Sequence, residues 1–280
     1  MLPPVVTTIA EVRAAVGAAR AARQPISFVP TMDALHEGHA ALVRAASGFV
    51  VVSIFVNPTQ FGPKEDFAKY PRTLDADRAL CGDAGASLIF APSVAEMYPE
   101  NSFTSVEVGT LGDHLCGAAR PGHFRGVCTV VLKLFNIVGP AVAHFGAKDF
   151  QQARIIGQMV RDLNVPVDVR VEPTVREPDG LALSSRNRYL SSTERAAAPA
   201  IYRALRAVRA RALAGEVDAA RLEGALHAEL SAIPGARIDY ARVVDAETLQ
   251  PRARLDRPAV VAVAVFVGTT RLIDNIRLAD

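Results

Sequence analysis

The sequence predicts an α/β fold in which a doubly wound parallel sheet is followed by a smaller C-terminal α+β domain. Apolar runs alternate with helical stretches through the first 175 residues, and most of these runs are apolar throughout. Such strands are typical of a parallel sheet that helices cover on both faces, as in Rossmann-like domains. Beyond residue 175 two helical stretches precede three strand-like runs. We therefore expect a Rossmann-like domain at residues 1–175 and a smaller domain at residues 176–280, which closes over a cleft between them.

The first domain is expected to contain four strands and five helices. Thr8 and Glu11 have the spacing of a capping box, which predicts an alanine-rich helix from there to about Arg23. Short apolar runs predict strands, of which the first is at residues 26–29. The other strands are expected at residues 50–56, 87–91 and 141–145, and the other helices at residues 40–46, 75–84, 127–137 and 149–164.

The second domain is expected to begin with a polar turn at residues 176–180. Two helices follow in the prediction, at residues 193–214 and 217–232. Period-two or apolar runs then predict strands at residues 237–244, 259–267 and 271–278. Helices before an independent set of strands indicate an α+β arrangement.

Composition excludes several classes of protein. The 280 residues carry a formal net charge of +2, which gives no field suited to nucleic acid or a membrane surface. Cys81, Cys116 and Cys128 are too few and too far apart for a zinc ribbon or a disulfide framework. The longest apolar runs, at residues 49–56 and 259–267, are too short to cross a bilayer as helices. We expect a soluble, unprocessed protein of the reducing cytoplasm.

The most informative motif follows the first expected strand and reads Pro30-Thr31-Met32-Asp33-Ala34-Leu35-His36-Glu37-Gly38-His39. A strand-to-helix turn presents backbone N–H groups that can receive a phosphate, and imidazoles there can neutralise charge on a leaving pyrophosphate. One histidine at a helix start is as readily a capping residue. The pair His36 and His39 is harder to explain by packing, and its spacing differs from the H-E-x-x-H of zinc proteases.

This motif is similar to the H-x-G-H signature of the nucleotidylyltransferase superfamily. With later segments it resembles the pantoate–β-alanine ligase (pantothenate synthetase) family. The matching segments are residues 30–39, 57–62, 70–73, 122–127, 145–152 and 181–189. The resemblance implies that ATP drives the condensation of (R)-pantoate with β-alanine through a pantoyl adenylate, with release of AMP and pyrophosphate. It also implies Mg²⁺ and a homodimer.

Polar side chains at the expected sheet edge suit the acid substrate. Gln60 follows the second strand, and its amide can both donate to a carboxylate and accept from a hydroxyl. The resemblance implies that Gln60 and Gln152 bind pantoate and that Arg120 adds positive charge near the acyl-transfer site. Asn57 is interpreted as part of an ordinary turn, and His123 as structural.

Two further segments suit a triphosphate. Gly146 comes just after the strand expected at residues 141–145, Lys148 can meet phosphate as a point charge, and Asp149 can accept from ribose hydroxyls or cap the next helix. The run Leu183-Ser184-Ser185-Arg186 has the composition of an anion clamp, although the same residues suit a solvated turn. The resemblance favours the clamp and implies that the Val175 backbone contacts adenine.

The resemblance assigns catalysis to His39 as proton donor and to His36, Lys148 and Arg186 as groups that stabilise phosphate charge. No metal ligand is assigned, because Asp75 and Asp77 suit either Mg²⁺ or an acidic first helical turn. The full predicted ATP-binding set is Met32, His36, His39, Gly146, Lys148, Asp149, Val175, Leu183, Ser184, Ser185 and Arg186.

Three positions depart from the family pattern. Asp33 replaces the usual glycine, Ala147 a common glutamate and Leu183 a common methionine. A carboxylate at position 33 would repel a triphosphate unless it turns away or meets a cation. Two alternatives remain. One is a related nucleotidylyltransferase that uses the same H-x-G-H chemistry on another acceptor, and the other is a non-catalytic ATP-sensing module, which Asp33 keeps open. The neutral amides of Gln60 and Gln152 argue against a phosphorylated acceptor.

Overall fold

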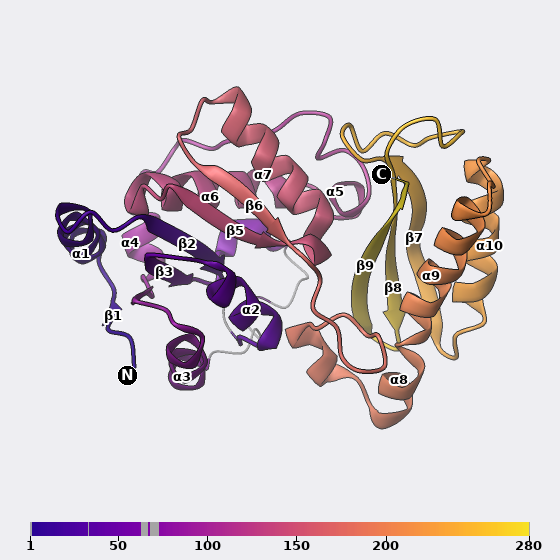
Figure 1. The fold of residues 1–280 in the computed structure, drawn as a ribbon, viewed down its shortest axis with the longest axis horizontal. Coiled ribbons are helices and arrows are strands. Elements are labelled where there is room, and N and C mark those ends of the chain that lie inside the picture. Colours follow the sequence, from indigo (N-terminus) through magenta and orange to yellow (C-terminus); the bar gives the residue numbers. More distant parts are fainter. Residues whose placement is uncertain (1, 33, 63–66, 68–72, 280) are drawn as a thin grey trace. The chain divides into compact units, whose positions relative to one another are not determined.

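The computed structural model describes residues 2–32, 34–62, 67 and 73–279, so Asp33 and residues 70–72 of a matching segment lie outside the described part. The chain forms two compact units (Figure 1). The first unit contains Met1–Gly109, Arg120–Ala147 and Gln152–Pro173, and the second contains Thr110–Ala119, Lys148–Gln151 and Thr174–Asp280. The domain boundary near Val175 stays a prediction.

The first unit contains a six-stranded sheet in which every neighbouring pair is parallel, as predicted. Four strands lie where the sequence predicted them, and two more were not expected. One of these has only two residues, and the other carries charged residues on an edge, so neither gives an apolar signal. The strands are β1 (Val5–Val6), β2 (Ile26–Thr31), β3 (Phe49–Ile54), β4 (Leu88–Phe90), β5 (Val142–Gly146) and β6 (Asp168–Glu172).

Helices pack against both faces of this sheet. Val29 of β2 shares a buried cluster with Val43 of α2 and Cys81 of α3, whereas Phe28 points to the other face and meets Phe135 of α6 edge-on at 6.3 Å. Adjacent strand residues point to opposite faces, so β2 serves both layers. The helices of this region are α1 (Ile9–Ala21), α2 (Glu37–Ala45), α3 (Leu74–Ala84), α4 (Val94–Met97), α6 (His123–Val138) and α7 (Phe150–Asp162).

The helix starts follow their capping groups. Thr8 and Glu11 form the predicted capping box of α1. Helix α2 begins three residues before the predicted start, because the His36 side chain caps it. None of the described helices is long and apolar enough to cross a membrane.

The strand order places a topological switch point between β2 and β5. The order is β1-β4-β3-β2-β5-β6, so the chain runs outward in opposite directions from these two neighbours. In such sheets ligands bind outside the carboxyl ends of the strands at the switch point. The segment that follows β2 carries His36 and His39, and the segment that follows β5 begins at Ala147, directly after Gly146.

The second unit contains an antiparallel sheet of β7 (Ala236–Asp245), β8 (Ala259–Val267) and β9 (Thr270–Ala279), in that order. The single helix predicted at residues 193–214 is wrong, because two helices occupy it. Pro199 separates them, since proline has no N–H to continue the first helix. These helices are α8 (Ser192–Ala197) and α9 (Ala200–Leu213), and α10 (Ala219–Ser231) follows.

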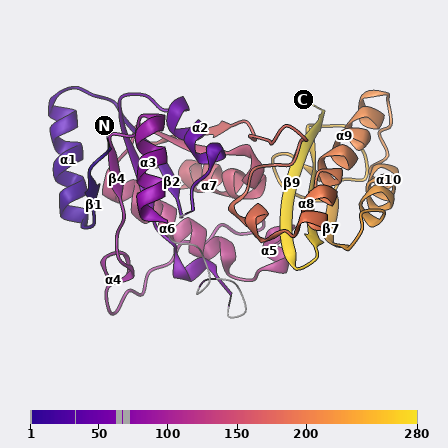
Figure 2. The same ribbon diagram turned by 90° about the horizontal axis from the view of Figure 1, so that it is seen from below.

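Both faces of the small sheet are covered by parts of its own unit. Helices α9 and α10 pack on one face (Figure 2), where Leu205 and Leu226 share a buried cluster with Val263 and Leu272. On the other face the segment Thr110–Ala119, with α5 (Cys116–Ala119), meets β7 and β9, since Cys116 Sγ lies 3.2 Å from Tyr240 Oη and 3.7 Å from Arg271 Nη2. Burial, with a contribution from Cys116, raises the pKa of Tyr240 well above its usual value.

Candidate active site

The two histidines of the H-x-G-H motif cap α2 with their own rings. His36 Nδ1 accepts from the Gly38 N–H at 3.1 Å, and His39 Nδ1 accepts from the His36 N–H at 3.2 Å. The ring centroids lie 4.1 Å apart. Because each Nδ1 accepts, the proton of the neutral ring belongs on Nε2. The capping contacts therefore set Nε2–H as the ring donor that could reach a phosphate.

Asp77 holds the turn that leads into these histidines. Its two carboxylate oxygens accept from the Ala34 N–H at 3.0 Å and the Leu35 N–H at 2.9 Å. The residue is only 2% exposed, and Thr73 Oγ1 donates to it as well. Ala34 has φ +53°, which costs strain for a residue with a Cβ. Asp77 lies in the first turn of α3, as one alternative expected, but its carboxylate supports the motif turn.

Gln60 is oriented by both ends of its amide. Its Oε1 accepts from Asn57 Nδ2 at 3.0 Å, and its Nε2 donates to Met32 Sδ at 3.1 Å. Asn57 in turn accepts from the Thr59 N–H and from Tyr98 Oη. The interpretation of Asn57 as an ordinary turn residue is therefore incomplete, because its side chain also fixes the rotamer of Gln60.

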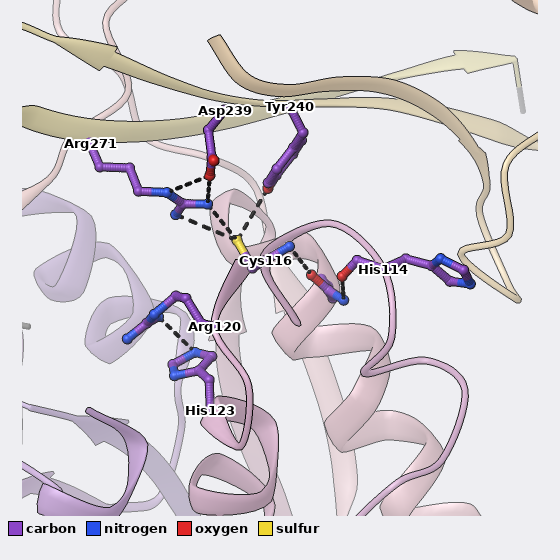
Figure 3. A network of polar contacts seen from close by, with 8 residues as sticks. His114, Cys116, Arg120, His123, Asp239, Tyr240 and Arg271 are labelled. Carbon is purple, nitrogen blue, oxygen red and sulfur yellow. Dashed lines mark hydrogen bonds and ion pairs between the residues drawn. The ribbon is translucent and has the colours of Figure 1, made fainter. Parts of the chain in front are cut away.

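Arg120 and His123 hold the backbone of Gln60. The Gln60 carbonyl accepts from His123 Nδ1 at 2.8 Å and from Arg120 Nη2 at 3.2 Å. Arg120 Nη1 lies 3.0 Å from His123 Nε2 (Figure 3). Since the carbonyl can only accept, Nδ1 carries the proton and Nε2 of the neutral ring accepts from Arg120. The structure thus brings together Met32, Gln60 and Arg120, and it gives His123 a supporting role.

Gly126 lets α6 approach the short 3₁₀ helix Pro58–Gln60 that carries Gln60. A Cβ at position 126 would lie 2.4 Å from Thr59 O and 2.7 Å from Gln60 N. Both neighbours are backbone atoms that cannot rotate away. A glycine is therefore required to keep the Gln60 backbone where it is.

The segment after β5 lies at the start of α7. Lys148 and Asp149 form a 3₁₀ turn (Ala147–Asp149), and Gln152 is in the first turn of the helix, partly exposed. The Lys148 carbonyl accepts from Asn275 Nδ2 of β9 at 2.9 Å. A Cβ at Gly146 would meet no atom within 4 Å, so the space beside that backbone is open.

The clamp segment follows a tight hairpin. The Val175 carbonyl accepts from the Leu183 N–H at 3.0 Å, which joins two residues of the predicted ATP set. Gly180 turns the chain at φ +95°, and a Cβ there would lie 2.7 Å from the Tyr202 ring. Ser184 Oγ then accepts from the Arg186 N–H at 3.3 Å and caps the 3₁₀ helix Ser185–Tyr189.

A family model described as pantoate-beta-alanine ligase matches residues 4–277. The chain belongs to this family. It is 54% identical over 274 residues to a pantothenate synthetase of Moorella thermoacetica, with 97% of each chain covered.

Solved structures agree with the family model. The pantothenate synthetase of Thermus thermophilus is 50% identical with a TM-score of 0.93, over 99% of this chain and 100% of that one. A pantoate-beta-alanine ligase of Francisella tularensis, complexed with beta-gamma ATP and beta-alanine, is 32% identical with a TM-score of 0.78, over 99% and 98% of the two chains.

The predictions of family, fold class and enzyme class are confirmed by these matches. The chain is a ligase that forms an amide bond with the use of ATP and makes pantothenate. The two alternatives, a nucleotidylyltransferase for another acceptor and an ATP-sensing module, are not favoured.

Proposed function

We propose that the ligase works in two half-reactions through a pantoyl adenylate. A carboxylate oxygen of (R)-pantoate attacks the α-phosphorus of ATP, and the bond from that phosphorus to the β-phosphate oxygen breaks to release pyrophosphate. The amine of β-alanine then attacks the carbonyl carbon, the bond to AMP breaks, and the amine loses a proton. No covalent enzyme nucleophile is needed, because positioning and electrostatics lower both barriers.

The observation that carries this proposal is the pair of ring caps at the start of α2. Each imidazole uses Nδ1 on the backbone, so Nε2–H is the donor that each neutral ring can direct at a phosphate. His39 acts as the proton donor to the leaving pyrophosphate. His36 stabilises the charge that develops on the phosphates.

Pantoate is held by amides and a guanidinium. Gln60 enters this role with its amide already oriented by Asn57, so little conformational entropy is lost on binding. Gln152 is proposed to bind the same substrate, and Arg120 adds positive charge at the acyl-transfer step. Because Arg120 also donates to the Gln60 carbonyl, loss of its side chain would disturb both functions.

ATP is proposed to contact the remaining residues of the predicted set. Lys148 and Arg186 stabilise phosphate charge, Asp149 accepts from the ribose, and the Val175 backbone meets adenine. The other members are Met32, Gly146, Leu183, Ser184 and Ser185. The hairpin contact between Val175 and Leu183 supports a shared role for these two segments.

Mg²⁺ is proposed to enter as the complex with ATP. Asp77 directs both carboxylate oxygens at backbone N–H groups, and no group of three metal-ligating side chains occurs among the described residues. Mg²⁺ commonly keeps several water ligands and binds to proteins together with substrate phosphates, so it needs no dedicated cluster of protein ligands. We further propose a homodimer, on the family resemblance alone, and a cytoplasmic location, on the small number and wide spacing of the cysteines.

Mass spectrometry of the products tests this mechanism. Purified protein is incubated with ATP, Mg²⁺ and pantoate, with and without β-alanine. We expect pantothenate and AMP only when β-alanine is present, and pantoyl adenylate with pyrophosphate when it is omitted. Pantothenate formation with no adenylate in a rapid-quench time course would contradict the two-step route.

A further inference from the structure

Two consecutive residues of β9, Asp274 and Asn275, reach two segments that are distant in sequence. Successive strand residues point to opposite faces of a sheet. Asp274 points to the face that α9 covers, and Asn275 points to the face that Thr110–Ala119 and Lys148–Gln151 cover. Both contacts lie within the second unit.

Asn275 fixes the backbone of the Lys148 turn. Its Nδ2 donates to the Lys148 carbonyl at 2.9 Å, across 127 residues of sequence. Four residues earlier on the same face, Arg271 approaches Cys116 Sγ at 3.7 Å and forms an ion pair with Asp239 at 2.8 Å (Figure 3). This face of the sheet is therefore a surface on which the segments from outside the C-terminal region are anchored.

Asp274 fixes the start of the clamp hairpin. Its two oxygens accept from both terminal nitrogens of Arg176, at 2.6 and 2.9 Å, and the carboxylate is only 5% exposed. Arg176 also donates to the Gly180 carbonyl and lies 3.6 Å from the centroid of the Tyr202 ring. A bidentate pair of this kind restricts direction as well as distance.

We infer that Asp274 and Asn275 are positioning residues for ATP, Asn275 through the backbone of Lys148 and Asp274 through the Arg176 hairpin, in which Val175 pairs with Leu183. This inference rests on the proposed function of Lys148 and of the hairpin. Strand β9 then positions both Lys148, which is proposed to bind phosphate, and the Arg176 hairpin, which is proposed to bind the rest of the nucleotide. The two residues act on different kinetic constants, because Lys148 stabilises developing charge whereas Val175 contributes to ground-state binding.

A double-mutant cycle tests the role of Asn275. Asn275→Ala is made alone and in a Lys148→Met background, and the rate of pantoyl adenylate formation is measured in single turnovers. We expect about a tenfold loss from Asn275→Ala in the natural background and no further loss beside Lys148→Met, because coupled residues are non-additive. Asn136→Ala, at an exposed position of α6, serves as the matched control and leaves the rate unchanged.

The same cycle separates failure of the inference from failure of the proposed function. Equal losses from Asn275→Ala in both backgrounds, or no loss at all, would overturn the positioning role. A natural rate in the Lys148→Met variant would overturn the proposed role of Lys148 and the role of Asn275 with it.

Arg176→Lys and Asp274→Asn test the second contact. Arg176→Lys keeps the charge and loses the fork, so it remains informative if Asp274→Asn fails to fold. We expect the KM for ATP to rise about tenfold while kcat changes less than about twofold. A fall in kcat with an unchanged KM for ATP, in a variant that melts like the natural protein, would overturn the role of Asp274.

Discussion

Local contacts position His36 and His39, whereas a contact from a distant part of the sequence positions the Lys148 turn. Each histidine ring is fixed by a backbone N–H no more than three residues away, within one helix start. The Lys148 carbonyl is instead fixed by Asn275, 127 residues later. The turn before the histidines stands between these cases, since Asp77 reaches it across 43 residues.

This difference separates what a motif specifies from what the fold must supply. A capping contact forms whenever the helix forms, so the orientation of a ring is specified by a few neighbouring residues. A contact between distant segments forms only after the small sheet has assembled. We therefore expect variants near the histidines to change chemistry, and variants near Lys148 or its neighbours to change stability and chemistry together.

The largest expected effect comes from two substitutions of His39 that distinguish its capping contact from its proposed catalytic role. The carboxamide oxygen of His39→Asn can replace Nδ1 as the helix cap, whereas the amide nitrogen of His39→Gln can replace Nε2 as the donor. We expect turnover to fall by about 100-fold or more in His39→Asn, and by less in His39→Gln. Steady-state assays and thermal melting measure both variants. Near-normal turnover in His39→Asn would remove the Nε2–H donor from the mechanism.

A second effect sharpens the long-range side of the comparison. Gln151 is buried, and its amide makes three hydrogen bonds, to the carbonyls of Leu111 and His114 and from the Cys116 N–H. Gln151→Met leaves these three groups without their partner and is expected to lower the free energy of unfolding by about 2 kcal/mol.

Urea denaturation measures this loss against a matched variant on the same helix. Gln158 bonds only to nearby exposed groups of α7 in the contacts described, so Gln158→Met is expected to change stability by less than about 0.5 kcal/mol. Equal losses in the two variants would show that the Thr110–Ala119 segment does not depend on Gln151.

The smallest effect compares two helical glycines. Gly126→Ala pushes a Cβ against the backbone of Thr59 and Gln60, so we expect the KM for pantoate to rise about tenfold. Gly224→Ala in α10 meets no atom within 4 Å and is expected to stabilise the protein by up to about 1 kcal/mol with no change in KM. An unchanged KM for pantoate in Gly126→Ala would show that pantoate binding does not depend on the packing of Gln60 against α6.

Much of the fold was predictable because its signals are local. The capping box at Thr8 and Glu11 and the strand at Ala259–Val267 lie where the sequence predicted them. Strand β6 was missed because Asp168–Glu172 is a half-exposed edge strand with charged residues, which gives no continuous apolar run. Pro199 inside the predicted long helix was a usable signal for the break that the structure contains.

The candidate site was predictable only in part. Motif spacing found His36, His39, Gln60 and Lys148, whose roles remain predictions. Their supports Asp77, Gly126 and Asn275 carry no motif of their own, and each becomes informative only once the fold brings it to its partner. An acid in a first helical turn or an asparagine in a strand has ordinary explanations that sequence alone cannot separate.

The chain passes repeatedly between its two units, and this limits which segments the ligase can exchange with a relative in a chimaera. Thr110–Ala119 and Lys148–Gln151 belong to the second unit although they precede Thr174 in the chain. A crossover with a relative at that point would inherit Asn275 from one parent and its partner Lys148 from the other. The second unit is therefore not a portable module, and chimaeras are expected to work only when all three segments come from the same parent.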